Sequence, residues 1–233
     1  MSALVVSGLR AGVAGREIVR GIDLTVNSGE VHALMGRPGY EVLGGSVTLD
    51  GVELLELPTW KRAQAGLYLS MQYPTEVPGI TVVEVLEEAF AATGRNRDEV
   101  RSLVAAEAAR IGFDERFVSR AVNVDMSGGE RKRNETLQLG VLRPKIAVLD
   151  ELDSGLDIDA LRAISRRVEE ATGEGLGVLA ITHYTRLLHE LRPDHVHVLN
   201  GGRIVRSGSA DLADELERTG YADYGEPGPT SPG

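Results

Sequence analysis

Residues 146–157 read IAVLDELDSGLD, and this stretch decides the class of fold. The run from Ile146 to Asp150 is apolar up to a final acid, which predicts a short buried strand with acidic side chains at its carboxyl end. We expect a helix from Asp159 to Thr172 and a second buried strand, GVLAIT, shortly after it. Apolar strands separated by a helix are typical of a largely parallel sheet that is covered on both faces. The sequence therefore predicts an α/β core.

The first half of the chain differs from this core. Gly-rich turns separate short apolar runs in the first quarter, and SVTLDGVELLE predicts a hairpin around Asp50 and Gly51. The strands expected there are Ala3–Val6, Val19–Val26 and Val31–Met35. Between Thr81 and Arg120 the apolar residues recur at helical spacing, so we expect an inserted helical subdomain over about residues 73–140.

The last third continues the α/β pattern. A helix is expected near Leu187, and HVHVLNGGRIV at residues 195–205 is expected to form one strand. Residues 222–233 are rich in Pro, Gly and Ser, a composition typical of a disordered tail. We therefore treat residues 1–221 as a single domain.

Composition excludes several classes of function. The 233 residues carry a formal net charge of −10, which disfavours broad electrostatic binding to nucleic acid. The absence of cysteine excludes disulfides and zinc–thiolate sites. No apolar run approaches the ~18 residues of a membrane-spanning helix, so we expect a cytoplasmic protein without direct membrane insertion.

The acids after the buried strand are the first candidate site. In a nucleotide hydrolase, Asp150 would hold Mg²⁺ through water and Glu151 would orient and polarise the attacking water. The alternative is a strand that ends in solvated acids, which is the better interpretation of an isolated Asp-Glu pair. The residues that follow, Ser154 to Asp157, favour the hydrolase.

The stretch MSGGERKRNETLQLGVL is the second candidate site. Ser127 is a good helix N-cap, and Gly128 and Gly129 permit close approach of another molecule to the backbone. Exposed amides at a helix N-terminus form an anion site, although Ser-Gly-Gly before a helix is often only a cap.

Gln72 and three histidines need separate interpretation. Gln72 lies between the β-rich part and the helical part, where its amide could contact a metal ion or water. His183 follows a buried strand, a position from which a side chain can face a phosphate, but a surface histidine at a strand end is the alternative. His195 and His197 share one strand face, and we interpret them as structural because no third metal ligand is near in sequence.

Five stretches, taken in order, resemble the motifs of ABC-type ATPases. MQYPTEVPG resembles the Q-loop, MSGGERKRNETLQL the signature, LDELDSGLDIDAL the Walker B motif with the D-loop, and ITHY the switch histidine, followed by HVHVLNGGRIVRSG. SGGERKRNE and DSGLDIDAL are similar to SufC-type ATPases of the Suf iron–sulfur cluster assembly system, and the resemblance runs from Leu4 to about Tyr221.

The resemblance implies an ABC-type nucleotide-binding domain that uses Mg-ATP. It assigns catalysis to Glu151 and His183 and the Mg²⁺ contacts, through water, to Asp150 and Gln72. The implied nucleotide contacts are Gln72, Ser127, Gly128, Gly129, Glu130 and Asp157. A SufB- or SufD-like scaffold is the implied partner, bound through Tyr73, Pro74 and Pro78, and the chain is expected to form a homodimer or to pair with an intact ATPase.

One motif of that family is missing. In SGEVHALMGRPGYEVLGGSVTLDG, residues 28–51, Gly36 runs directly into Arg37, where family members have a P-loop and a helix of roughly fifteen residues in all. A P-loop supplies backbone amides, a Lys and a hydroxyl to the phosphates and Mg²⁺. Its loss weakens phosphate binding by about a hundredfold or more. Neither Arg37 nor Lys61 can be assigned as a substitute.

Three functions remain open at this stage. The chain is an ATPase subunit of iron–sulfur cluster assembly with impaired nucleotide binding, a non-hydrolysing interaction subunit, or the ATP-binding subunit of a transporter.

The missing helix also has a folding cost, because three or four apolar side chains that would cover the sheet are absent, which removes roughly 5–10 kcal/mol of burial.

Overall fold

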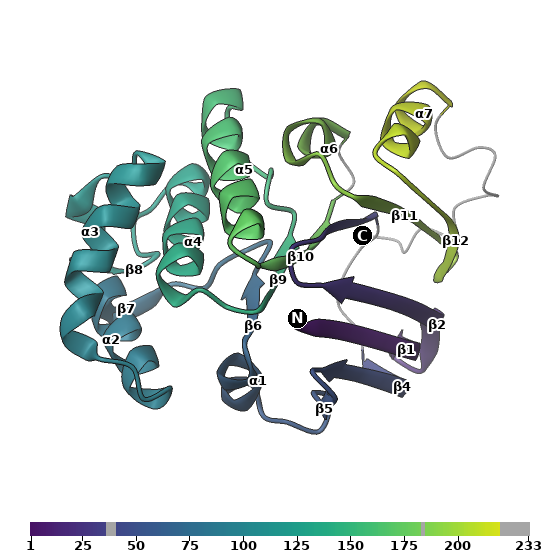
Figure 1. Ribbon diagram of the computed structural model, residues 1–233, viewed down its shortest axis with the longest axis horizontal. Helices are drawn as coiled ribbons and strands as arrows, with labels where there is room; N and C mark the ends of the chain where they lie inside the picture. The colour runs from purple at the N-terminus through teal and green to yellow at the C-terminus, as the bar shows by residue number, and fades with distance from the viewer. Residues whose placement is uncertain (36–40, 183–184, 220–233) are drawn as a thin grey trace.

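The computed structural model describes residues 1–35, 41–182 and 185–219 (Figure 1). The larger sheet among these residues has six strands in the order β12-β11-β3-β10-β9-β6. They are β3 (Val31–Met35), β6 (Leu67–Ser70), β9 (Ile146–Asp150), β10 (Gly177–Ile181), β11 (His195–Asn200) and β12 (Arg203–Gly208). Neighbouring strands are parallel except β11 and β12, which are antiparallel. The predicted α/β core with a mostly parallel sheet is confirmed.

A smaller antiparallel sheet packs on one face of this main sheet. Its order is β2-β1-β4-β5, from β1 (Ala3–Val13), β2 (Arg16–Asn27), β4 (Glu41–Leu49) and β5 (Val52–Glu53). The turn between β4 and β5 has positive φ at Asp50 (52°) and Gly51 (80°), which suits a tight hairpin and confirms the prediction. Leu4, Leu24 and Leu49 of this sheet share an apolar cluster with Ile146 and Leu179 of the main sheet.

A group of helices lies at the left of Figure 1 and has its own apolar cluster. Its elements are α2 (Val82–Ala92), α3 (Val100–Ile111), α4 (Gly128–Leu142), two short strands, β7 (Val77–Thr81) and β8 (Ala121–Val122), and the 3₁₀ turns η1 (Arg97–Glu99) and η2 (Glu115–Phe117). Thr81 starts α2 with a capping box that Glu84 completes. Leu86 and Phe90 of α2, both fully buried, lie in the cluster with Val104 of α3 and Leu137 of α4.

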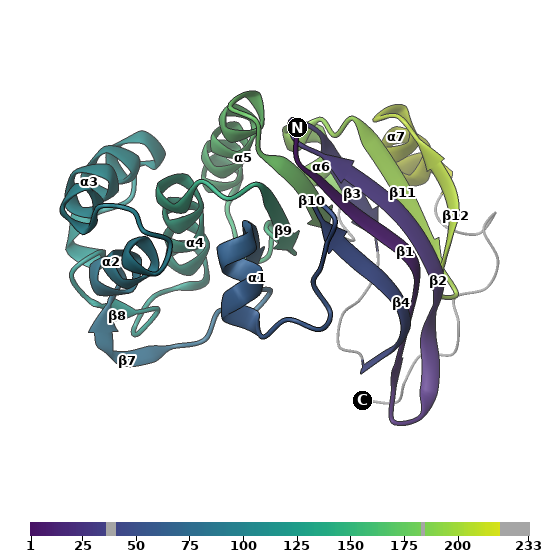
Figure 2. The ribbon, with the colours of Figure 1, turned by 60° about the horizontal axis from the view of Figure 1, so that its bottom comes forward.

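The remaining helices are α1 (Thr59–Ala65), α5 (Ile158–Gly173), α6 (Thr185–Leu191) and α7 (Asp211–Thr219). Asp157 caps α5 because its Oδ1 accepts a hydrogen bond from the backbone N–H of Ala160 at 2.7 Å. Leu161 and Ile164 of α5 pack into the main sheet. Figure 2 shows α1 standing between the helical group and β4.

The two faces of the main sheet are covered to different extents. The face toward α4, α5, α6 and α7, which we call the helix-covered face, has residues that are 0–1% exposed: Ala33, Ala147, Leu149, Val178, Ala180, Val196 and Val198. The face toward the antiparallel sheet, which we call the sheet-covered face, is incompletely covered near the carboxyl ends of the strands. There Leu34, Val148, Ile181 and Leu199 are half-buried, and Leu69 is 52% exposed.

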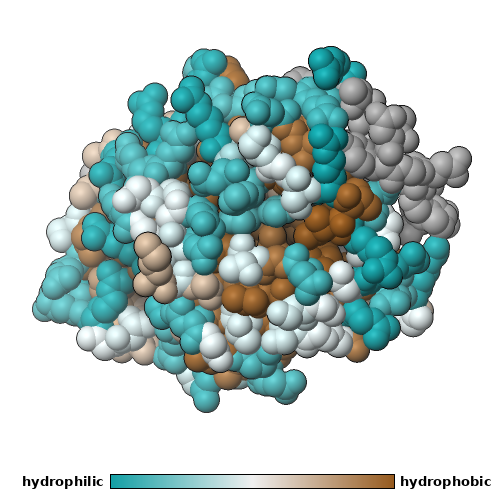
Figure 3. Space-filling model, turned by 45° about the vertical axis from the view of Figure 1, so that its right-hand side comes forward, coloured by the Kyte–Doolittle hydropathy of each residue, from teal (hydrophilic) through white to brown (hydrophobic). Residues whose placement is uncertain are grey.

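Apolar side chains are also exposed at the molecular surface. Figure 3 brings the right-hand side of Figure 1 forward and shows hydrophobic residues gathered in a patch near the middle of that side. Apolar side chains at least 44% exposed also occur on strands β4 and β12, at Val42, Leu43 and Val205.

The structure corrects one expectation and adds elements that the sequence did not predict. The single strand expected over residues 195–205 is a hairpin, because Gly201 and Gly202 take positive φ (55° and 81°) and turn β11 into β12. Helices α1 and α7 and strand β6 were not predicted. The sequence of α1, TWKRAQA, carries no apolar stripe, and none of its residues is buried. Within the described ranges no helix has the length and apolar character to cross a membrane.

Candidate functional site

The candidate site lies at the carboxyl ends of the parallel strands. Strand β6 ends at Ser70, β9 at Asp150 and β10 at Ile181, and the parallel register aligns these ends along one edge of the sheet. In open α/β sheets this edge is where ligands bind. Gln72 follows β6, and its Nε2 donates a hydrogen bond to Oε2 of Glu151, which follows β9. The structure therefore brings together two of the predicted site residues.

Asp150 and Glu151 form the acidic centre of this edge. Burial and the neighbouring charge of Glu151 raise the pKa of Asp150. Its Oδ1 is buried and has no hydrogen-bond partner within the described parts of the chain. A carboxylate oxygen buried without a partner is costly, and a cation would offset that cost. This donor set therefore fits a hard cation such as Mg²⁺.

Glu151 is held in an uncommon backbone conformation. Its φ is +46°, in the left-handed region that costs a non-glycine residue on the order of 1 kcal/mol. The backbone N–H of Glu151 donates to the carbonyl of Ile181 at 2.9 Å, which fixes the turn after β9 to the end of β10. Strain of this kind is concentrated at functional sites, where it aims a side chain. Here the side chain points back to Gln72.

Lys132 and Glu135 of α4 connect the helical group to this edge, and neither was predicted. Lys132 is 2% exposed, and its Nζ donates to the carbonyl of Met71 at 2.5 Å and to that of Asp150 at 3.3 Å. Glu135 accepts from Ser70 Oγ at 2.8 Å and from Met71 N–H at 2.9 Å, and it lies 3.3 Å from Lys132 Nζ. Burial raises the pKa of Glu135. The basic helix was visible in the sequence, but not which of its charges are buried.

The signature stretch starts α4, and Ser127 is its N-cap. The Ser127 hydroxyl accepts from the backbone N–H of Glu130 at 3.3 Å, and Glu130 Oε2 accepts from the N–H of Ser127 at 2.7 Å. This capping box lowers the pKa of Glu130. Gly128 is exposed, and a Cβ there would meet no atom within 4 Å, whereas one at Gly129 would lie 3.6 Å from Leu156. The helix N-terminus is thus accessible to another molecule.

The loop after Gln72 is largely exposed and is held in place by a hydrogen bond from the helical group. Tyr73 is 77% exposed and Pro78 is exposed, while Pro74 is half-buried. Asn123 Nδ2 donates to the carbonyl of Thr75 at 2.9 Å, which holds the loop against the helical group. A role of these residues in binding a partner stays a prediction.

Other predicted features lie outside the described residues. These are His183, Arg37 at the junction where a P-loop was expected, and the tail at residues 222–233. Among the described residues, the chain passes from the end of β3 at residue 35 to the start of β4 at residue 41, and residues 36–40 connect them.

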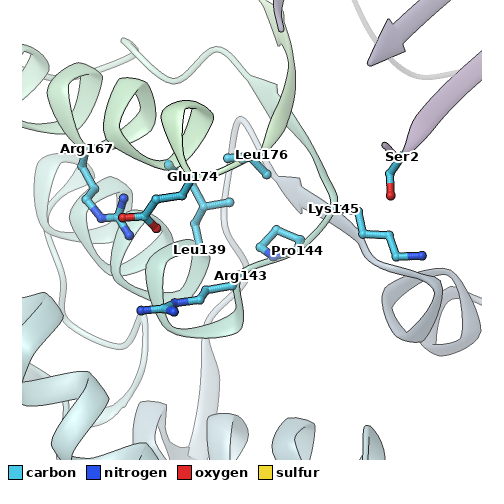
Figure 4. A pocket seen from close by; sticks show the side chains of 10 residues that line it. Ser2, Leu139, Arg143, Pro144, Lys145, Arg167, Glu174 and Leu176 are labelled. Carbon is cyan, nitrogen blue, oxygen red and sulfur yellow. The ribbon is translucent and has the colours of Figure 1, made fainter. Parts of the chain in front are cut away.

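Two hollows lie away from the carboxyl edge. One, of about 380 Å³, is lined by Lys145 and Leu176, which precede β9 and β10, together with Arg167 and Glu174 of the α5 end (Figure 4). Another, of about 600 Å³, lies between α1 and α2 and includes Trp60. Because the first is at the amino ends of the strands, it is separate from Asp150 and Glu151.

Comparisons with known proteins agree with this architecture. A family model described as ABC transporter matches residues 39–154. A protein of Streptococcus pyogenes serotype M18, named as a probable ABC transporter ATP-binding protein, is 46% identical over 242 residues, covering 95% of this chain and 94% of the relative. Vegetative protein 296 of Bacillus subtilis is 43% identical, covering 94% of this chain and 92% of the relative.

Solved structures of ABC cassettes share the fold. The ATP-binding subunit of an ABC transporter has a TM-score of 0.78 at 23% identity and covers 93% of both chains. A bacterial ABC transporter cassette solved as a dimer has a TM-score of 0.75 at 17% identity, covering 89% of this chain and 98% of the cassette. These likenesses show the fold, and the sequence relatives show the family. The chain therefore belongs to the ABC transporter ATP-binding protein family.

Proposed function

We propose that this chain is a SufC-type ATP-binding subunit of iron–sulfur cluster assembly that binds Mg-ATP weakly by itself because its P-loop is missing. The motifs SGGERKRNE and DSGLDIDAL, which resemble the SufC type, support the assignment. We place the protein in the cytoplasm, where such a subunit would meet its scaffold.

The short connection between β3 and β4 carries the proposal. Only residues 36–40 join the two strands, which is too short for a phosphate loop and a helix. The alignment to the Streptococcus relative has 242 positions, more than the 233 residues of this chain, so the relative has additional residues. The family match starts at residue 39, beyond the junction. The incomplete cover of the sheet-covered face agrees with a missing helix.

The residues that remain have definite tasks in ATP hydrolysis. Asp150, with Gln72, would hold Mg²⁺ through water, and the ion would neutralise phosphate oxygens. Glu151 would accept a proton from the attacking water, and its hydrogen bond from Gln72 supports this role. Gln72 orients that carboxylate. None of these groups replaces the amides and Lys of a P-loop.

In the resembled family the sites are composite, and the P-loop of one subunit faces the signature of the other. We therefore propose that the chain contributes Ser127 to Glu130 to a site whose P-loop belongs to an intact relative. In such a mixed dimer, Ser127→Arg should abolish ATP hydrolysis because it puts bulk and charge at the helix N-terminus. Glu151→Gln should leave hydrolysis nearly unchanged, because Glu151 serves the site without a P-loop. Equal loss in both variants would contradict this division.

ATP binding tests the proposal directly. We expect calorimetry to show at least a hundredfold weaker Mg-ATP binding by the chain than by a matched variant in which the P-loop and helix of an intact relative are inserted between Gly36 and Arg37. The two proteins share every other residue, so the comparison isolates the effect of the P-loop and its helix. Micromolar binding by the unmodified chain would show that another group rebuilds the site.

The names of the relatives favour a second candidate, the ATP-binding subunit of a transporter. The partner distinguishes the two. We expect a SufB- or SufD-like scaffold to be captured by the chain, and Tyr73→Ala with Pro74→Ala to weaken capture. Arg97→Ala with Arg101→Ala, also on the helical group, is the control, since both side chains are exposed and lie on η1 and α3, outside this loop. Capture of a transporter's membrane subunit in place of the scaffold would favour the second candidate.

A further inference from the structure

A cluster of histidines lies at the amino ends of β3 and β11, on the edge of the sheet opposite to Asp150. The parallel register pairs His195 with His32, and their ring centroids are 4.6 Å apart. His197, two residues further along β11, has its ring 5.3 Å from that of His32. Glu30 precedes β3 and contacts the same ring. The candidate site at the carboxyl ends of the strands, with Asp150 and Glu151, uses none of these groups.

A chain of hydrogen bonds fixes the central ring. His197 Nδ1 lies 2.8 Å from Ser207 Oγ, and His197 Nε2 lies 3.0 Å from His32 Nδ1. His32 Nε2 is 3.1 Å from Glu30 Oε2. That carboxylate is fixed in turn, because Asn27 donates to it from its backbone N–H at 3.0 Å and from Nδ2 at 2.9 Å. His32 and Glu30 are therefore held in place before any ligand arrives.

We propose that Glu30, His32 and His195 bind a first-row divalent transition-metal ion such as Zn²⁺. One ligand atom from each lies within 4.8 Å of the others. The His32–Glu30 separation of 3.1 Å is close to the about 3.3 Å between neighbouring ligands of a tetrahedral zinc. His195 is exposed, so its side chain can rotate to complete the set. Water from solvent fills the remaining position.

The surrounding groups match the needs of such a site. With Nε2 of His32 on the metal, its Nδ1 carries the proton and donates it to His197 Nε2, the outer hydrogen bond that metal-bound histidines usually make. Two imidazoles and one carboxylate select Zn²⁺, Co²⁺ or Ni²⁺ over Mg²⁺. The bound ion would join the start of β3 to the start of β11.

Metal titration of the purified full chain tests the site. The expression tag is removed, and millimolar Mg²⁺ is added to occupy the carboxylate site at the carboxyl ends of the strands. Zn²⁺ is titrated in competition with a chromogenic chelator, and Co²⁺ absorption reports nitrogen ligation. We expect one Zn²⁺ per chain and at least a tenfold loss of affinity in His195→Ala. This variant changes an exposed side chain and should keep the fold, which circular dichroism checks.

His189→Ala is the matched control. His189 is also a histidine with an exposed side chain, but it lies on α6, where it pairs with Asp214 at 3.6 Å. Its variant should bind Zn²⁺ as the unmodified chain does. Glu30→Gln keeps the size of the side chain and should weaken binding without unfolding. Equal affinity in the unmodified chain and His195→Ala, or equal loss in His189→Ala, would overturn the proposal and leave a hydrogen-bonded histidine cluster without a metal.

Discussion

The two faces of the main sheet show how unevenly this molecule is stabilised. On the helix-covered face, Ala147, Val178 and Val196 are 0% exposed because α5, α6 and α7 pack over them. On the sheet-covered face, the antiparallel sheet buries the amino half, but Leu69 near the carboxyl ends is 52% exposed. The two faces belong to the same strands, and only the elements that cover them differ. The difference agrees with the proposal that a helix is missing on the sheet-covered face, near the carboxyl ends of the strands.

The largest expected effect concerns the buried ion pair on the helix-covered side. Glu135→Ala leaves Lys132 buried without its carboxylate, which should lower the free energy of unfolding by about 3–5 kcal/mol. Glu76→Ala, which removes the exposed partner of Arg131 on the same helix, should cost less than about 1 kcal/mol. Denaturant unfolding measures both. Equal costs would mean that Lys132 is stabilised by its carbonyl contacts alone.

A matched pair of leucines compares the two faces directly. Leu149→Ala on the helix-covered face should cost about 2–5 kcal/mol, because the residue is 1% exposed and its loss leaves a cavity. Leu69→Ala, on the other face, should cost less than about 1 kcal/mol since half of its side chain is already in water. Chemical denaturation of the two variants gives the ratio. If Leu69→Ala is as costly as Leu149→Ala, the sheet-covered face is packed more tightly than its exposure indicates.

Inserting the segment that we propose to be missing should reduce the difference between the faces. Insertion of the P-loop and helix of a relative between Gly36 and Arg37 would bury Leu34, Val148 and Leu69. The gain from burial is partly offset by the ordering of the inserted backbone, so we expect a net rise in stability on the order of 2 kcal/mol. Thermal unfolding in the absence of nucleotide measures it. A scrambled insert of equal length is the control, and an equal rise with that insert would contradict specific packing.

The smallest expected effect is a change in pH dependence. Burial raises the pKa of Glu135, so the folded protein keeps this proton at a pH where the unfolded chain, with an ordinary value of 4.5, has lost it. Stability from this group therefore falls as pH rises above about 4.5. Glu135→Gln removes the ionisation and should flatten that part of the curve relative to the unmodified protein. Urea unfolding at several pH values above 4.5 gives the difference, and parallel curves would show that the pKa is not raised.

The sequence predicted the features that depend on neighbouring residues. The strand that ends in Asp150, the N-cap at Ser127 and the turn at Asp50 and Gly51 follow from hydrophobic period, capping and turn chemistry, and all are found in the structure. The absence of a G-x-x-x-x-G-K-[ST] pattern is also a local feature of the sequence, and the loss of a P-loop and its helix stays a proposal. Helix α1 was missed because no buried stripe marks it.

The sequence by itself determined the α/β class, the acids at the strand end and the motifs of the family, because these are written in residues close together along the chain. Only the tertiary structure decided which distant groups meet. Strand order places His32 beside His195, and it brings Gln72 to Glu151 and Lys132 to Met71. Local periodicity tells which way a side chain faces, but not which strand lies next to it. The histidine cluster therefore could not be found from the spacing of His195 and His197, because its third histidine lies on β3 and its carboxylate, Glu30, directly precedes that strand.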